Sequence, residues 1–506
     1  MGTSFIEPRL GALSFIAFIP VLKLAFRSSF ALSYLYSLLM GLVVFAVANH
    51  WVYGFLENLI GAPVKTRLLF AIYLIYSAQV ICLFVLTARW FARKLPSWAS
   101  LAVTPLAACS IFHYWPAVFQ FNPALTQINF THMLQPVALF SHWSLAAFII
   151  FINLLLVRQW LPKAKPQHLL TAPLTAFSLG FFLWLVLGAI SRWNFNSDNA
   201  VPTPLTIGFH QPLEPVGAEQ PSLKTGFTRS YTGELANSYY LAIAGASLIV
   251  WPESRPKDIL DKPWVLNAYK NHAQKMAADL MVQEVTQVQQ RPAQFRNASI
   301  FISKTQEHRL HHKVKRIPFG ETLPEVLDHG LLGSWLRRFF SGVLKQIQAG
   351  EKPQIFTHNN IKILPQICYE FLDGHLVNST LRQNPEVQLI IAQSNDSWFY
   401  SRSQVHLHNA FAVLRAVENR RPLLHVVNGG PSFVIDAYGE IRQRSEYQVA
   451  GGFIAELQIS KSSQNHRVLI PPKTFIQLAT SISLLVYLVV LLKPYRRPKR
   501  HRKNRP

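Results

Sequence analysis

Several long stretches of the chain carry no charged side chain, and short basic segments separate them. A helix needs about 20 mainly apolar residues to cross the hydrocarbon core of a bilayer. The stretch 95–157 is long enough for two such helices and the others for one each, while residues 10–22 are apolar but short for a full span. The pattern therefore predicts a multi-pass membrane protein with about six helices before residue 193 and one near the C-terminus. The stretches without Asp, Glu, Lys or Arg are 28–56, 68–88, 95–157, 166–191 and 474–492.

Basic residues between these stretches predict how the helices are oriented, because loops rich in Lys and Arg stay on the cytoplasmic side of a membrane. The tail KPYRRPKRHRKNRP follows the last apolar stretch and should lie on that side too. Residues 193–472 should then face the other side. The net charge of +24 mainly reflects this topology, so we expect no nucleic-acid partner. The basic residues in the first, third and fifth breaks are Lys23, Arg27, Arg89, Arg93, Lys94, Arg158, Lys163 and Lys165.

The hydrophilic segment has the pattern of an α/β domain. Short β-rich runs such as SLIVWPE, ASIFISK, IKILPQICYE, VQLIIAQSND and PLLHVVNGG recur in it. Between them lie two stretches that we expect to be helical, VLNAYKNHAQKMAADLMVQEVTQVQ and VHLHNAFAVLRAVENR. Alternating strands and helices indicate α/β layers. The expected division is a membrane domain at 1–192, the α/β domain at 193–472, a transmembrane helix at 473–493 and a basic cytoplasmic tail at 494–506.

Cysteine usage directs attention to one thiol. Cys82 and Cys109 lie within predicted spans, where a buried packing role is expected. Cys368, in ICYE, is the one cysteine of the α/β segment. It has no partner there for a disulfide, and no Cys and His cluster has the spacing of zinc ligands, so we expect no metal. A solitary thiol of this kind is either a buried packing residue or a nucleophile.

Three ionisable residues end or follow strand-like runs and join Cys368 as candidates. Glu253 ends LIVWPE, while Lys313 and Glu321 open and close KVKRIPFGE. Taken singly, each has a plain structural explanation as a helix cap, a solvated charge or a turn carboxylate. Taken together, they resemble the Glu, Lys and Cys catalytic set of the nitrilase superfamily.

With membrane helices on both sides of this domain, the chain resembles the bacterial apolipoprotein N-acyltransferase family. The resemblance includes WPE, KVKRIPFGE and ICYE, followed in order by SNDSWF, QVHLHNAFAVLRAVENRRPL and VNGGPSFVIDAYGEI. It covers residues 247–441 well and the membrane part more loosely. The fold class that it implies is a multi-pass α-helical membrane domain plus an α/β nitrilase-like αββα sandwich. The V-Q-G-N-like strand with a following Trp, and the G-F-P-W turn, are altered in this chain.

The resemblance also assigns roles to the candidate residues. It implies that Glu253 takes the proton of Cys368, which becomes an efficient nucleophile as a thiolate. Lys313 would stabilise the developing oxyanion. Glu321 would position the lysine or help to handle protons, and Glu370 would shape the turn that carries the cysteine.

The reaction implied is a two-step acyl transfer that needs no cofactor. Cys368 would take an acyl chain from a membrane phospholipid as a thioester. The α-amino group of a diacylglyceryl-modified N-terminal cysteine on an apolipoprotein would then accept the chain as an amide. The resemblance places such an enzyme in the bacterial inner membrane, with its catalytic domain on the periplasmic side.

A candidate lid follows Glu321 in TLPEVLDHGLLGSWLRRFFSGVLKQI. Its apolar residues, among them Trp335 and Phe339, are interleaved with arginines, as in segments that lie at a lipid surface. A helix packed on the domain would explain the same pattern. Trp398, in SNDSWF, is a further candidate for a substrate contact.

Three other functions remain open on the sequence. The chain could be a nitrilase-like membrane protein of plasmid conjugal-transfer systems, or a membrane-tethered amidase that uses water as the acceptor. It could also be a scaffold that keeps the fold without catalysis. Intact Glu253, Lys313 and Cys368 argue against the scaffold, while the altered recognition segments weaken the lipoprotein assignment.

Overall fold

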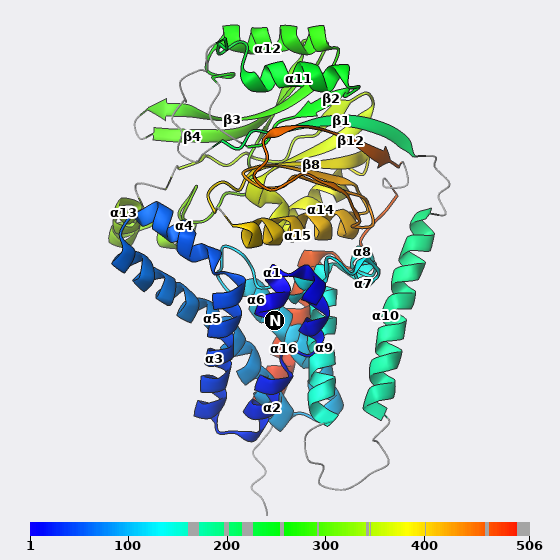
Figure 1. Ribbon diagram of the computed structural model, residues 1–506. Helices are drawn as coiled ribbons and strands as arrows, with labels where there is room; N and C mark the ends of the chain where they lie inside the picture. Colours follow the sequence, from blue (N-terminus) through cyan, green and yellow to red (C-terminus); the bar gives the residue numbers. More distant parts are fainter. Residues whose placement is uncertain are drawn as a thin grey trace, which may run out of the picture.

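The molecule has a helical bundle at one end and two stacked β-sheets with covering helices at the other (Figure 1). The computed structural model describes residues 1–159, 172–196, 202–214, 226–253, 258–290, 293–340, 344, 346–399, 401–460 and 465–492. Lys163, Lys165 and the basic tail from residue 493 lie outside the described residues.

The bundle is built from the N-terminal part of the chain and one C-terminal helix. Its longer helices are α2 (Ile19–Arg27), α3 (Phe30–Ala48), α4 (Trp51–Ile60), α5 (Pro63–Lys94), α6 (Ser97–Tyr114), α9 (His142–Gln159), α10 (Ala172–Asn196) and α16 (Pro472–Leu492). Shorter elements join them: α1 (Gly2–Ile6), η1 (Pro8–Phe15), η2 (Pro123–Gln127), α7 (Thr131–Leu134) and α8 (Val137–Phe140).

Several of these helices are long and apolar enough to cross a membrane. Among the described residues they are Pro8–Arg27, Phe30–Ala48, Pro63–Lys94, Ser178–Phe195 and Pro472–Leu492. A further candidate is broken, because Thr131–Phe140 and His142–Arg158 meet at 119°. Ser141, at the break, has a φ of 68°. The short stretch 10–22 lies within the first of these helices.

Basic side chains cap the end of the bundle that lies away from the sheets. Arg89 donates hydrogen bonds to the carbonyls of Ala25 (3.1 Å) and Ser28 (3.0 Å), and Arg93 also binds the Ser28 carbonyl (3.1 Å). Arg158, near the end of α9, donates to the carbonyl of Ser97 at the start of α6. Arg89, Arg93 and Arg158, which are distant in sequence from their partners, therefore gather at one end of the bundle.

Two six-stranded sheets form the centre of the α/β domain. The first has the order β12-β1-β2-β3-β4-β5 and the second β11-β10-β9-β8-β7-β6. The strands of the first are β1 (Thr203–Gln211), β2 (Leu248–Val250), β3 (Asp279–Gln290), β4 (Ala293–Ile302), β5 (His308–His312) and β12 (Gly451–Ile459). Those of the second are β6 (Phe356–His358), β7 (Ile361–Ile367), β8 (Val387–Asn395), β9 (Leu423–Asn428), β10 (Phe433–Ile435) and β11 (Ile441–Arg444).

Alternating side chains of the strands fill two of the domain's cores. Ile207 and Phe209 of β1 meet residues of the second sheet, such as Ile363 and Leu389, in the core between the sheets. The outer face of the first sheet is covered by α11 (Gly233–Ile243) and α12 (Pro263–Met276). Helices α14 (Gly374–Gln383) and α15 (Arg402–Asn419) lie on the second sheet, between it and the bundle (Figure 1). The predicted fold class, a helical membrane domain plus an αββα sandwich, is confirmed.

One predicted helix is wrong in its second half. The stretch that begins at Val265 was expected to remain helical to Gln289, but α12 ends at Met276 and β3 begins at Asp279. Ala277 ends the helix in a left-handed conformation, with a φ of 53°. Beyond it, Leu280 and Val282 point to the core under α11 and α12, while Met281 points to the core between the sheets. This two-sided burial favours a strand over the helical period that we inferred.

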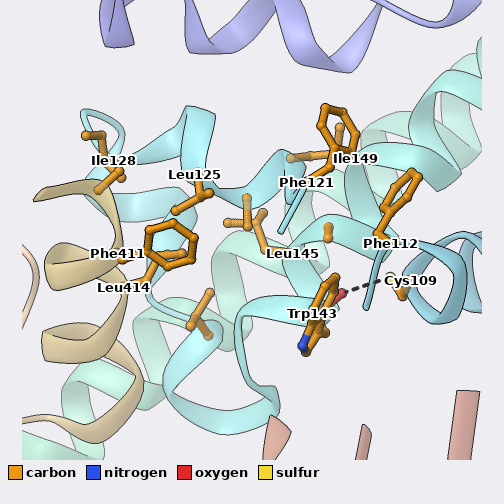
Figure 2. Close-up of a cluster of buried hydrophobic side chains, with 14 of the residues drawn as sticks. Cys109, Phe112, Phe121, Leu125, Ile128, Trp143, Leu145, Ile149, Phe411 and Leu414 are labelled. Carbon is orange, nitrogen blue, oxygen red and sulfur yellow. Dashed lines mark hydrogen bonds between the residues drawn. The ribbon is translucent and has the colours of Figure 1, made fainter. Parts of the chain in front are cut away.

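The bundle and the sandwich share one continuous hydrophobic cluster. Figure 2 shows Phe411 and Leu414 of α15 facing Leu125 and Ile128 of the bundle, and the Cys109 thiol donating to the Trp143 carbonyl at 3.5 Å. Helix α15 is buried at every position from Ser403 to Asn419 except His406, because it is covered on both sides. Cys82 and Cys109 are both buried.

Polar contacts fix the same interface. Arg420, which follows α15, donates to Gln135 Oε1 (2.7 Å) and to Ser191 Oγ (2.8 Å) of the bundle. Glu418 accepts from the His142 backbone N–H (3.1 Å). The sandwich is thereby held at a fixed place above the helices.

Candidate active site

Cys368 stands on a strained turn at the end of a buried strand. Strand β7 ends at Ile367 and pairs in parallel with β8, and Cys368 opens the short helix η4 (Cys368–Leu372). Its φ is 48°, a left-handed value that a residue with a Cβ rarely adopts. Such strain is typical of functional sites, where the surrounding structure enforces it.

Glu370 provides much of that enforcement. Its side chain is fully buried and accepts hydrogen bonds from the backbone N–H of Ile367 (2.7 Å) and of Val314 (2.6 Å). His311 Nε2 lies 2.9 Å from Glu370 Oε2, the oxygen that also accepts from Ile367. Burial raises the pKa of Glu370, but His311 and the backbone N–H donors outweigh it and leave the pKa below its ordinary value. One carboxylate therefore ties the Cys368 turn to the segment after Lys313.

Lys313 is fully buried and paired. Its Nζ donates to Glu321 Oε1 at 2.7 Å, and Glu321 Oε2 accepts from the Ile317 N–H at 2.9 Å. Burial lowers the pKa of Lys313, but the charges of Glu321, Glu253 and Cys368 outweigh it, so the pKa lies above its ordinary value. The lysine is thus a fixed cation among acidic groups.

Glu253 follows β2 and reaches the same place. Its Oε1 accepts a hydrogen bond from Asn297 Nδ2 (2.8 Å), and the Asn297 oxygen accepts from Gln283 Nε2 (2.7 Å). Burial and the Glu253 charge raise the pKa of Cys368 well above its ordinary value, against the opposing charge of Lys313. The resting thiol is therefore protonated, with a carboxylate and a cation beside it.

A second buried pair lies behind the cysteine turn. Asp396 follows β8, and its Oδ1 lies 2.9 Å from His408 Nδ1. The His408 ring stacks on Phe371 with centroids 4.8 Å apart, and Phe371 belongs to η4. The pair thus supports the turn from the side of α15.

Sequence reasoning missed Asn297, Gln283, His311 and the Asp396–His408 pair. All five are buried polar residues within or directly after a strand or helix, and a polar residue at such a position is the only local signal that could have indicated them. Their partners lie on other elements of the chain, so no motif spacing in the sequence predicts these contacts.

The remaining candidates are at least partly exposed. Trp335 and Phe339 belong to α13 (Gly330–Phe339), are 57% and 53% exposed, and stack with centroids 5.4 Å apart. Phe340 joins this helix to the Glu321 loop through Phe319, at 5.5 Å. Trp398 is half-buried in the turn after β8. The described residues hold no group of three or more His, Cys, Asp or Glu arranged for a metal ion.

This arrangement can perform nucleophilic acyl transfer. A protonated thiol sits beside a carboxylate that can take its proton, and a fixed ammonium group can meet a developing oxyanion. No side chain in the set requires a cofactor for these steps.

Family models match two parts of the chain. The model of the apolipoprotein N-acyltransferase N-terminal domain matches residues 1–155, and the carbon-nitrogen hydrolase model matches residues 228–466. Together they cover most of the bundle and most of the sandwich, including Glu253, Lys313 and Cys368.

Two proteins named apolipoprotein N-acyltransferase are similar to this chain over most of its length. The apolipoprotein N-acyltransferase of Haemophilus ducreyi is 25% identical over 439 residues, which cover 82% of this chain and 80% of that protein. Apolipoprotein N-acyltransferase 1 of Treponema denticola is 20% identical over 476 residues, 85% of this chain and 82% of its own. Among solved structures, an amidase from Nesterenkonia sp. matches with a TM-score of 0.36 and 14% identity, over 50% of this chain and 90% of that one.

Proposed function

Because the chain belongs to the apolipoprotein N-acyltransferase family of the nitrilase superfamily, we propose that it moves a fatty acyl chain from a membrane phospholipid to an apolipoprotein. The acceptor is the α-amino group of the N-terminal diacylglyceryl-cysteine. The observation that carries the proposal is the electrostatic interaction of Glu253 and Cys368 with the buried Lys313.

The first half-reaction forms a thioester. Glu253 takes the Cys368 proton as the sulfur attacks the ester carbonyl of the phospholipid, and Lys313 stabilises the oxyanion of the tetrahedral intermediate. When the carbon–oxygen bond breaks, Glu253 returns the proton to the leaving oxygen. The products are a lysophospholipid and the Cys368 thioester.

The second half-reaction uses the same groups. The neutral α-amino group of the acceptor attacks the thioester carbonyl, and Glu253 takes a proton from the attacking nitrogen. The carbon–sulfur bond then breaks, and the proton passes to the sulfur. The acyl chain leaves as an amide and the thiol is regenerated.

The shared hydrophobic cluster supports a role for the bundle in this chemistry. Both substrates carry acyl chains, and a sandwich held directly above membrane helices meets them where they lie. We place the protein in the inner membrane, with the sandwich on the periplasmic side. The gathering of Arg89, Arg93 and Arg158 at the opposite end of the bundle supports that orientation.

Helix α13 is the proposed lid. Trp335 and Phe339 leave half of their surface exposed, and Leu331 is 92% exposed, so an apolar face is available to lipid. The contact between Phe340 and Phe319 links this helix to the loop that ends at Glu321. We assign Trp398 to the substrate side of the β8 turn.

An assay with both substrates tests the function. The purified protein is incubated with phospholipid carrying a labelled acyl chain, with and without a synthetic diacylglyceryl-cysteine peptide. Label on the peptide amine is the expected result, with little free fatty acid. Release of free fatty acid that is indifferent to the peptide would contradict the proposal and identify a hydrolase, and no turnover of either substrate would favour a scaffold.

A further inference from the structure

A cavity of about 380 Å³ lies where the bundle meets the sandwich. Its walls come from the end of α6, the first residues of α9, α14 and α16, and the residues beside the catalytic segments. In Figure 1 this is the level between α14 and the ends of the bundle helices that face the sandwich. The cavity therefore lies at the end of the bundle that faces the sandwich.

Positive charge dominates the described lining. Lys315 and Lys473 both line the cavity, and His375 adds a third basic side chain. Helices α9, α14 and α16 all begin at its wall, and a helix start carries a partial positive charge.

One carboxylate, Asp373, faces this positive set. It lies 3.1 Å from Lys315 Nζ and accepts the N–H groups of His375 (3.0 Å) and Leu376 (3.1 Å) at the start of α14. Asp373 is thus already paired with Lys315 and with the backbone N–H groups at the start of α14. In the part of the chain that the structure describes, no carboxylate lies within 4.0 Å of the Lys473 ammonium, which is exposed at the cavity.

The cavity is adjacent to the catalytic segments. Tyr369, which directly follows Cys368, forms part of the wall, and its hydroxyl donates to the Val118 carbonyl, also at the wall. The wall therefore includes the residue that follows the proposed nucleophile in the sequence. Lys315 likewise follows Lys313 by two positions.

From these observations we infer that the cavity binds the phosphate of a glycerophospholipid head group. This inference rests on the proposed function and deepens it, because a phosphate held here keeps the ester carbonyls, a few bonds away, near Cys368. Lys473 is the main cation for the phosphate, and the start of α16 adds to it. Farther along the same face of α16 as Lys473, Leu484, Leu488 and Leu491 are exposed and offer an apolar surface to the acyl chains.

The test measures binding in a protein that cannot turn over. Full-length Cys368→Ser protein in detergent is titrated with a short-chain diacylglycerophospholipid, with the diacylglycerol of the same chains, and with inorganic phosphate. The same titrations are made with Lys473→Gln and Lys473→Glu added, and with Lys352→Gln as a matched control. Lys473 and Lys352 are both exposed, so these substitutions leave the fold intact.

We expect Lys473→Gln to weaken phospholipid binding about tenfold, because one hydrogen bond to a charged group is lost, and Lys473→Glu to weaken it at least as much. Lys352→Gln and the diacylglycerol titrations should show no change on substitution. Unchanged phospholipid affinity in both Lys473 variants would overturn the inference. Inorganic phosphate binding as tightly as the phospholipid would also overturn it, since the site would then serve free phosphate.

Failure of the proposed function gives a different result. If phospholipid binding depends on Lys473 while the wild-type protein forms no thioester, the result supports the head-group site and contradicts the proposed acyl transfer. In active protein, we expect Lys473→Gln to raise the KM for phospholipid and to leave the transfer from a preformed thioester to the amine unchanged. A lower rate of transfer from the thioester to the amine, with no change in the KM for phospholipid, would contradict a head-group role.

Discussion

Replacing Lys313 by Met separates its catalytic role from its structural role. The lysine is fully buried, and its Nζ lies 2.7 Å from Glu321 Oε1. Its removal leaves a mostly buried carboxylate without its cation, which costs roughly 3–5 kcal/mol of stability. It also removes the ammonium group proposed to face the oxyanion, a loss of about 100- to 1,000-fold in acylation rate.

The double variant Lys313→Met/Glu321→Gln distinguishes the two effects. Glutamine at 321 removes the unpaired charge and keeps an oxygen for the Ile317 N–H, so most of the lost stability should return. The acylation rate should not return, because the ammonium group is still missing. Thermal unfolding measures the first quantity, and single-turnover labelling from labelled phospholipid measures the second, with exposed Lys352→Met as the control. Recovery of the rate together with the stability would refute the oxyanion role.

Three further results are expected. Asn297→Leu should slow acylation about tenfold or more, because Glu253 loses the hydrogen bond that holds it. Single-turnover rates measure this effect, and the exposed control Asn271→Leu should leave the rate unchanged. Equal rates for the two variants would exclude this role for Asn297. Glu370 has a depressed pKa, so its stabilisation is present above the ordinary value of 4.5 and is lost as the pH falls through the folded value. The melting temperatures of wild type and Glu370→Gln should therefore differ at neutral pH and converge in acid; a constant gap would contradict this. An alkaline phosphatase fusion near residue 300 should be active and one after residue 495 inactive, and reversed activities would invert the proposed orientation.

The sequence predicted those parts of the fold that depend on local pattern. Charge-free stretches predicted the apolar helices, and short apolar runs rich in β-branched residues around Ile249, Ile363 and Ile391 predicted buried strands. The stretch after Met276 was misread because two-sided burial of β3 removes the alternation that marks a strand.

The candidate site was predictable only through its motifs. WPE, KVKRIPFGE and ICYE led to Glu253, Lys313 and Cys368, and the structure brings their charges together. The supports could not be predicted, because Asn297 and His311 act on partners far away in sequence. The cavity with Lys473 could not be predicted either, since its walls come from five helices, α6, α9, α14, α15 and α16, that meet only in the folded chain.

The most direct test of the account is whether an acyl chain can be trapped on Cys368. Wild-type protein incubated with acyl-labelled phospholipid, without an acceptor, should carry the label on Cys368 as a hydroxylamine-sensitive thioester, found by mass spectrometry of the Cys368 peptide. Cys368→Ser should carry no thioester, Glu253→Gln should acylate slowly, and Cys82→Ala should label like wild type. Thioester labelling that persists in Cys368→Ser, or full acyl transfer without Cys368, would contradict the account.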